Sequence, residues 1–263
     1  MIGAIIGDVV GSRFEFNNIK TKDFELVVDR SCFTDDTVMT VAVADVLING
    51  NPYNKDDVID TLKKWGKKYP YAGYGGHFFD WVLGSARKPY NSCGNGSAMR
   101  VSAAGWVGKS EEEVIDLAKR VTEVTHNHPE GMKGAIVTAL SIYYARMGKS
   151  KEFLRKYMER EYPEIKKLDY EELRRTYRHE AEICQVTLPE ALYCFLISNS
   201  FEDCLRTTIS IGGDCDTTSA ISCAIAEAFY KEIPESLVKA VRRKLPKEML
   251  DVWIRFKIYS KVR

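Results

Sequence analysis

Two segments of this chain are apolar on nearly every side of a helix, and they restrict the folds that the chain can adopt. They read T-V-M-T-V-A-V-A-D-V-L-I at 37–48 and T-S-A-I-S-C-A-I-A-E-A-F-Y at 218–230. A helix without a polar face must be covered by other elements all round. With 263 residues, 45% of them hydrophobic, the chain can build a core of that size. We therefore expect one domain over residues 1–263 with these two helices at its centre.

The remaining segments show the periodicity of amphipathic helices. Between Ser110 and Thr125, apolar side chains recur at steps of three and four residues, and Ser110 and Glu113 match a capping box. Alternating strand patterns are nearly absent, since V-V-D-R and T-T-I-S-I are short and isolated. The sequence predicts an all-α bundle. Further helical patterns occur around 56–69, 132–147, 150–162, 169–183, 188–199 and 235–244.

The charges of the chain nearly cancel. With 38 basic and 37 acidic residues, no overall field favours nucleic acid or an anionic membrane. The apolar run at the N-terminus is interrupted by Asp8, and no stretch approaches the ~18 apolar residues that a membrane span needs. We expect a soluble, cytoplasmic protein. The charged stretch 150–182 is expected to form a solvated helical face.

Acids and threonines stand together at the start of both central helices. Asp35 and Asp36 follow Thr34, and Asp214 and Asp216 precede Thr217. Asp and Thr are favoured at helix N-termini, where an acid complements the helix dipole by ~0.3–1 kcal/mol. Capping explains one acid per helix and leaves the others without a reason.

The surplus carboxylates need cations, because an unpaired carboxylate near the core is costly. Apart from Arg30, no Lys or Arg lies within five residues of Asp35 and Asp36, and none lies so close to Asp214 and Asp216. Carboxylate and hydroxyl oxygens suit Mg²⁺ or Mn²⁺ rather than zinc. Two clusters make two ions plausible, and such a pair can orient a substrate and lower the pKa of a bound water.

Three glycines mark the first segment. Gly3, Gly7 and Gly11 lie four residues apart, so one face of an N-terminal helix would carry no side chains. Close packing of a neighbour explains this spacing as well as a functional role does. Glu15, just past the last glycine, is the residue here for which we expect a role.

Two glycine-rich turns, in Y-A-G-Y-G-G-H-F-F-D at 71–80 and N-S-C-G-N-G-S-A-M-R-V at 91–101, each lead into a predicted helix. Backbone N–H groups at helix starts can bind phosphate, although a Gly-Asn-Gly sequence is also a common turn. Downstream, His126 and His128 precede a helix with Pro129 at its first position; either could contact a ligand, and His128 is better explained as a structural or surface residue. The candidate substrate-binding residues are Gly75, Ser92, Cys93, Gly94, Asn95, Gly96 and His126.

Taken together, these motifs resemble the ADP-ribosylglycohydrolase family. The motifs are G-D-x-x-G-x-x-x-E at 7–15, F-T-D-D-T at 33–37, S-C-G-N-G-S-A-M-R at 92–100, T-H at 125–126 and G-G-D-C-D-T-T at 212–218. Their order and spacing agree over roughly residues 2–230. The resemblance implies a single-domain, orthogonal helical bundle with a dinuclear Mg²⁺ or Mn²⁺ site in a central cleft.

The resemblance also implies residue roles. Glu15 would contact or gate the bound ribose and water. The segment 92–96 would receive the diphosphate and distal ribose, and His126 would border the adenosine side. The implied metal ligands are Thr34, Asp35, Asp36, Asp214, Asp216 and Thr217.

The implied reaction is hydrolysis at C1″ of an ADP-ribosylated protein or a small ADP-ribosyl conjugate, with release of ADP-ribose. The ions would hold the 2″- and 3″-hydroxyls, and Asp35, Asp36 or Glu15 would activate the attacking water. Arginine-specific relatives are thought to use an additional acid before S-x-G-N-G. Between Tyr71 and Ser92 the only acid here is Asp80, predicted on a helix, which argues against arginine as the leaving group without excluding it.

Two other functions compete with hydrolysis of ADP-ribosyl groups. D-C-D-T-T also satisfies the D-x-D-x-T motif of haloacid-dehalogenase-type phosphatases, but that motif normally ends an early strand of a parallel sheet. The second alternative is a non-catalytic relative that binds ADP-ribose. An oxygen donor at every ligand position argues against it.

Overall fold

Both apolar segments form helices buried at the centre of the molecule. The computed structural model describes residues 1–178 and 182–262. The first segment lies in α2 (Asp35–Asn49) and the second in α13 (Cys215–Tyr230), and nearly every side chain of the two helices is buried. No strand occurs in the described ranges, where a single antiparallel bridge joins Gly94 to Ile183. The all-α prediction is confirmed.

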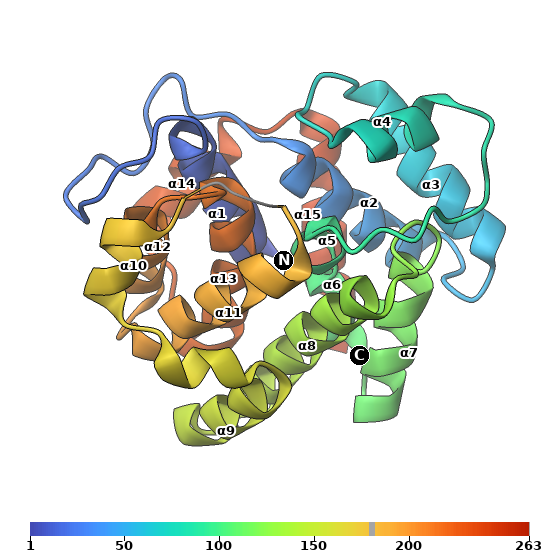
Figure 1. Cartoon of the computed structure of the whole chain (residues 1–263). Helices are drawn as coiled ribbons and strands as arrows, with labels where there is room; N and C mark the ends of the chain where they lie inside the picture. The colour runs from blue at the N-terminus through green and yellow to red at the C-terminus, as the bar shows by residue number, and fades with distance from the viewer. Residues whose placement is uncertain (179–181, 263) are drawn as a thin grey trace.

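The other helices cover these two. Figure 1 shows α1, α12 and α13 together in one half of the molecule, with α2, α3 and α4 in the other and α8 running between them. None of the described helices is both long enough and apolar enough to cross a membrane. The remaining elements are α1 (Ile2–Gly11), η1 (Ser12–Phe14), α3 (Lys55–Lys68), α4 (Gly76–Leu83), α5 (Gly96–Arg100), α6 (Ser102–Val107), α7 (Glu111–Thr122), α8 (Pro129–Arg146), α9 (Lys151–Glu161), η2 (Pro163–Lys167), α10 (Tyr170–Thr176), α11 (Cys184–Ile197), α12 (Phe201–Ile211), α14 (Glu235–Arg242) and α15 (Lys247–Val262).

The glycine face of α1 packs directly on the backbone of α13. A Cβ atom on Gly3 would overlap the carbonyl of Cys223, and one on Gly7 would overlap the carbonyl of Ser219. A Cβ on Gly11 would stand 2.6 Å from the Cys215 carbonyl oxygen at the first residue of α13. The spacing of these glycines is therefore required by packing, and it sets the position of the acidic start of α13 beside the end of α1.

Side chains fix several helix starts as the sequence predicts. Ser110 accepts a hydrogen bond from the Glu113 N–H at 3.2 Å, while the Glu113 carboxylate accepts from the Lys109 N–H at 2.8 Å. The His128 Nδ1 accepts from the Glu130 N–H at 3.1 Å and caps α8, so this histidine is structural.

Two segments differ from their patterns. The β-branched run T-T-I-S-I at 207–211 ends α12, because the alternation is too short to outweigh the amphipathic helix that precedes it. The helical pattern at 169–183 yields only α10, which ends at Thr176, and part of that pattern lies outside the described residues.

Candidate functional site

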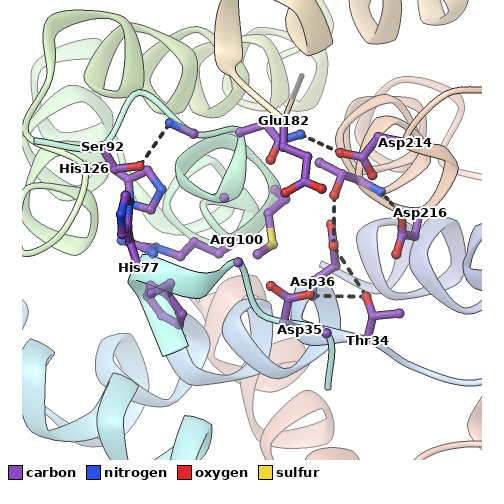
Figure 2. Close-up of a pocket in the computed structure, with 18 of the residues that line it drawn as sticks. Thr34, Asp35, Asp36, His77, Ser92, Arg100, His126, Glu182, Asp214 and Asp216 are labelled. Carbon is purple, nitrogen blue, oxygen red and sulfur yellow. Dashed lines mark hydrogen bonds between the residues drawn. The ribbon is translucent and has the colours of Figure 1, made fainter. Parts of the chain in front are cut away.

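A cleft of about 230 Å³ lies where the first turns of α2 and α13 meet the two glycine-rich turns. Figure 2 shows the acids of α2 and α13 at one end of the cleft and Ser92, His77 and His126 at the other. The lining residues are Glu15, Thr34, Asp35, Asp36, Gly73, Gly75, Gly76, His77, Phe78, Tyr90, Ser92, Gly94, Asn95, Gly96, Met99, Arg100, His126, Glu182, Asp214, Asp216 and Thr217.

The two acid clusters meet although they are far apart in the sequence. The Thr217 hydroxyl donates a hydrogen bond to Asp36 Oδ2 at 3.1 Å, which joins α13 to α2. Carboxylate oxygens of Glu15, Asp214 and Asp216 all lie within 4.8 Å of one another. The structure thus brings Glu15 and both predicted clusters to one end of the cleft.

A fifth aspartate stands behind the first cluster. Asp8 of α1 is fully buried, and it accepts from the Thr34 hydroxyl at 2.8 Å and from the Thr34 N–H at 3.0 Å. It also accepts from the Thr37 N–H at 2.9 Å. The Thr34 hydroxyl thus donates its proton to Asp8, and its oxygen accepts from the Asp36 N–H at 3.4 Å, which leaves one lone pair to face the cleft. The sequence signal for this role was an aspartate inside an otherwise apolar helix.

Burial disfavours the ionised form of the carboxyl groups at this end of the cleft. It raises the pKa of Asp35 and of Asp36 well above their usual range, and the carboxylate of Asp8 raises both further. Burial likewise raises the pKa of Asp216, and the carboxylate of Asp214 is the charge that raises it most. Burial raises the pKa of Asp8 itself to about 6. The raised pKa values of these four acids indicate that a positive charge bound here would be favourable.

The donor set fits a divalent cation. Asp36 Oδ1 is buried and has no hydrogen-bond partner among the described residues. An unpartnered buried carboxylate oxygen is costly unless a cation or proton satisfies it. Carboxylates together with the Thr34 and Thr217 hydroxyls make an all-oxygen donor set, which suits a hard cation. The cluster could therefore hold a metal ion.

The loop before α13 contains two glycines with positive φ angles. Gly212 and Gly213 have φ angles of 78° and 74°, in the region that residues with a side chain rarely adopt. Asn18 clamps this loop, since its amide donates to the Gly213 carbonyl at 2.9 Å and its Oδ1 accepts from the Gly213 N–H at 2.8 Å. The ring of Tyr177 occupies the space that a Gly213 side chain would need.

The turn at 92–96 is tied to the acidic end. Asn95 is buried, and its side-chain amide donates to Asp214 Oδ2 at 2.6 Å and to the Thr187 hydroxyl at 2.9 Å. The Gly94 N–H donates to Ser92 Oγ at 3.1 Å and the Asn95 N–H to the Glu182 carbonyl at 3.0 Å. Two backbone N–H groups expected to be open for phosphate are therefore occupied within the protein. This differs from the sequence prediction, which could not show how the turn closes on itself.

Cys93 does not line the cleft. Its carbonyl accepts from the Cys184 N–H at 3.0 Å and joins the turn to α11. Ser92, Gly94, Asn95, Gly96 and His126 all line the cleft.

The first turn of α4 forms the opposite wall. A Cβ atom on Gly75 or Gly76 would meet open space, so the backbone there is accessible from the cleft. Arg100 is only 1% exposed, and its guanidinium lies 5.7 Å from the Phe78 ring centroid. Burial lowers the pKa of Arg100 to about 10, so it stays protonated at neutral pH. This end of the cleft therefore carries a positive charge, opposite to the acids.

Sequence reasoning missed several lining residues. Arg100 closes the S-C-G-N-G-S-A-M-R motif, which was the signal that could have identified it. Glu182, the last residue of the charged stretch that was expected to be solvated, is exposed as expected and also lines the cleft from the chain before α11. Asp80 lies on the exposed side of α4 and does not line the cleft.

The fold and the cleft define an all-α protein with an acid-lined cleft that can hold a divalent cation. A sequence model of the family described as ADP-ribosylglycohydrolase matches residues 1–259. The chain belongs to the ADP-ribosylglycohydrolase family.

Individual relatives agree with this assignment. The chain is 28% identical over 312 residues to "ADP-ribosylhydrolase ARH3" of Bos taurus, with 90% of this chain and 86% of the relative covered. It is 23% identical over 277 residues to "ADP-ribosyl-[dinitrogen reductase] glycohydrolase" of Rhodospirillum rubrum, with 94% and 90% covered. A solved "ADP-ribosylglycohydrolase-related protein complex" superposes with a TM-score of 0.74 at 23% identity, covering 98% of this chain and 95% of that chain. This last likeness supports the fold.

Proposed function

We propose that this protein hydrolyses the C1″ glycosidic bond of an ADP-ribosylated protein or small ADP-ribosyl conjugate and releases ADP-ribose, with two Mg²⁺ or Mn²⁺ ions as cofactors. Family membership over residues 1–259 supports this activity, as do the relatives that are ADP-ribosylhydrolases. The observation that carries the proposal is the meeting of two acid–threonine clusters in one cleft whose far end is positively charged.

The polarity of the cleft suits an ADP-ribosyl group. Such a group has a diphosphate at its middle, which needs N–H donors and positive charge, and a terminal ribose whose hydroxyls can bind cations. Arg100 and the accessible first turn of α4 supply the positive end. The cluster around Asp36 and Asp216 supplies the end where cations would sit. The scissile C1″ would then lie beside the carboxylates.

The ligands proposed for the two ions are the oxygens of two helix starts. When bound, divalent ions supply positive charge that polarises substrate oxygens and offsets the buried carboxylates. Asp8 would keep the Thr34 oxygen turned toward the cleft. Asn95 would hold Asp214 in place. The proposed ligands are Thr34, Asp35, Asp36, Asp214, Asp216 and Thr217.

Hydrolysis needs a base for the attacking water. The water adds its hydroxyl to C1″, its proton passes to a carboxylate, and the leaving group departs with the bonding electrons and takes up a proton. A base must be ionised and within hydrogen-bond reach of the water. Asp36 keeps Oδ1 without a partner among the described residues, and Glu15 stands within 4.8 Å of Asp214 and Asp216. These two and Asp35 are the candidates for the base. The variant Glu15→Gln distinguishes Glu15, which follows η1, from Asp35 and Asp36, which belong to α2.

The alternatives make different predictions. A haloacid-dehalogenase-type phosphatase needs its D-x-D-x-T motif at the end of a strand, whereas in the described structure D-C-D-T-T follows α12 and begins α13. That alternative is therefore wrong on fold. A non-catalytic reader would bind ADP-ribose but release none from any conjugate, so a turnover measurement decides between reader and hydrolase.

The test is a panel of ADP-ribosylated substrates with arginine, serine, nucleotide-base and ester leaving groups. Each is incubated with Mg²⁺, with Mn²⁺ or with chelator, and released ADP-ribose is quantified. We expect release from at least one conjugate, dependent on the divalent ion. Tight binding of ADP-ribose without release from any conjugate would replace the hydrolase by the reader, and release unaffected by chelator would remove the metal cofactors from the proposal.

A further inference from the structure

His126 forms part of the buried wall of the cleft, and its two ring nitrogens have different surroundings. The residue is 4% exposed. Its Nε2 faces the glycine turn, because a Cβ atom built on Gly94 or Gly96 would lie 3.4 or 3.3 Å from that nitrogen. Its Nδ1 points the other way, into the protein, and lies 2.8 Å from the Thr125 hydroxyl oxygen. The proton on the Thr125 hydroxyl therefore decides which nitrogen of His126 is protonated.

The surroundings of Thr125 direct that proton. The Arg100 guanidinium donates to Thr125 Oγ1 at 2.8 Å, and arginine is always a donor. The hydroxyl then has two acceptors within reach, which are His126 Nδ1 at 2.8 Å and the Thr122 carbonyl at 3.5 Å. The shorter distance favours the histidine.

The Thr122 carbonyl is also already occupied. It accepts from the Thr125 N–H at 3.2 Å, from the His126 N–H at 3.0 Å and from Arg100 at 3.3 Å. A carbonyl oxygen has two lone pairs, so a fourth donor gains little there. The Thr125 hydroxyl is thus left with His126 Nδ1 as its acceptor.

We infer that Arg100 and Thr125 act as positioning residues that lock His126 as the neutral Nε2–H tautomer, so that it presents a fixed hydrogen-bond donor to an acceptor atom of the ligand over the 92–96 turn. The ligand part of this inference rests on the proposed function; the tautomer part rests on the protein alone. Its donor would meet an oxygen of the ADP-ribosyl group, the phosphate oxygens being the most strongly accepting.

The charges around His126 agree with this arrangement. Burial lowers the pKa of His126 well below its usual value, and the nearby Arg100 charge lowers it further. The uncharged ring of Tyr90 also lies near His126, with ring centroids 6.2 Å apart. A second proton on Nδ1 would place two donors against each other across the Thr125 contact. His126 is therefore an orienting donor, and proton transfer in the reaction belongs to the carboxylates.

The tautomer is measured directly in the ligand-free protein. In protein labelled with ¹⁵N at histidine, long-range ¹H–¹⁵N correlation spectra distinguish a protonated from an unprotonated ring nitrogen. The chain has four histidines, and a His126→Gln variant assigns the signal. We expect Nε2 protonated and Nδ1 unprotonated from pH 6 to pH 8. A protonated Nδ1 in the wild-type protein would overturn the inference, whatever the protein proves to hydrolyse.

Matched threonine variants test the cause. Thr125→Val removes the hydroxyl, and we expect mixed tautomers at His126 and about tenfold weaker binding of ADP-ribose. Thr125→Ser keeps the hydroxyl and should keep both properties. Thr122→Val is the control, because its hydroxyl is equally buried and makes no hydrogen bond in the described structure. An unchanged tautomer in Thr125→Val would overturn the role of Thr125. Weaker binding in all three variants alike would show a packing effect and overturn the relay.

Discussion

The acids of this protein fall into two regions that treat negative charge in opposite ways. On the helix surfaces, acids pair with bases one turn away: Asp116 with Arg120 at 3.2 Å, Glu152 with Lys156 at 2.7 Å and Glu235 with Lys239 at 2.8 Å. In the cleft, the charges that act most strongly on the pKa values of Asp35, Asp36 and Asp216 are other carboxylates.

The difference indicates where a bound cation would change the energy of the protein most. The net charge is close to zero, and on the surface acids pair locally with bases. Exposed pairs contribute little stability each, and their loss is tolerated. The cleft acids are costly in the protein alone, so a bound cation changes their energy far more. Removing an acid from one region should therefore have consequences that removing one from the other does not.

The largest effect is expected on activity. Asp216→Asn removes a carboxylate at the acidic end while keeping the shape of the side chain. Mutating residues that only hydrogen-bond to a metal ligand typically lowers activity by about 10–100-fold. For Asp216, a proposed ligand itself, we therefore expect a loss of hydrolysis of at least about a hundredfold. Helical content by circular dichroism should be preserved. ADP-ribose release is the readout.

Asp116→Asn is the matched surface control. Its carboxylate is 42% exposed and pairs with Arg120 within α7. Activity should stay within about twofold of the wild type. The contrast between the two regions fails if both variants lose activity alike, or if Asp216→Asn stays active and indifferent to metal.

The next effect is on stability. Mg²⁺ or Mn²⁺ at about 100 times its dissociation constant should stabilise the wild-type protein by about 2.7 kcal/mol, because the ions bind only the folded state. The melting temperature should rise accordingly and fall back with chelator. Asp36→Asn should lose most of this rise, whereas Glu152→Gln, on the surface of α9, should keep it. No rise with either ion would argue that the cluster is not a metal site.

A smaller effect concerns Glu190 of α11, a half-buried acid outside the cleft lining. Its Oε2 has no partner among the described residues, and burial raises its pKa to about 7. A pKa raised on folding contributes stability that is complete below the unfolded pKa of about 4.3 and is lost as the pH rises through 7. The full shift corresponds to about 3.5 kcal/mol at pH 8, and because the side chain is only half-buried we expect Glu190→Gln to gain about 2 kcal/mol on the wild type at pH 8 and nothing at pH 4. Urea unfolding at both pH values measures this; an equal difference at the two would contradict it.

The smallest effect has the opposite sign. Glu248 of α15 pairs with Lys68 at 2.7 Å and accepts from the Tyr69 hydroxyl at 2.5 Å, which lowers its pKa to about 2. This contribution is present above the unfolded pKa and is lost as the pH falls through 2. Because the side chain is 39% exposed, we expect Glu248→Gln to cost only about 0.5 kcal/mol at pH 7. A gain in stability at pH 7 would break the contrast with Glu190.

The fold was largely predictable because its strongest signals are local. The segments 37–48 and 218–230 become α2 and α13 with starts only two or three residues earlier, at Asp35 and Cys215. An apolar helix with acids at its start must bring those acids near the core, so the meeting of the two clusters followed from burial. The run T-T-I-S-I was less clear, since β-branched residues are compatible with either structure until the packing of α12 decides.

The rest of the cleft depends on contacts that no local pattern contains. Glu182 is exposed, as its charged neighbourhood indicated, and it lines the cleft only because the chain returns there before α11. Asp8 was noted as an interruption of an apolar run, while its bond to Thr34 needs the approach of α1 to α2. The occupied N–H groups of Gly94 and Asn95 depend likewise on how the turn folds onto its own side chains and onto the 182 region.

The glycine face of α1 has a consequence for how the cleft can evolve and respond. Where Gly7 meets Ser219, the two main chains are in direct contact, with no side chain between them that could change rotamer or be substituted. The position of α1 against α13 is thus fixed by main-chain atoms and does not vary with side-chain rotamers. Substitutions elsewhere can change the side chains that line the cleft, while the distance between α1 and α13 stays the same.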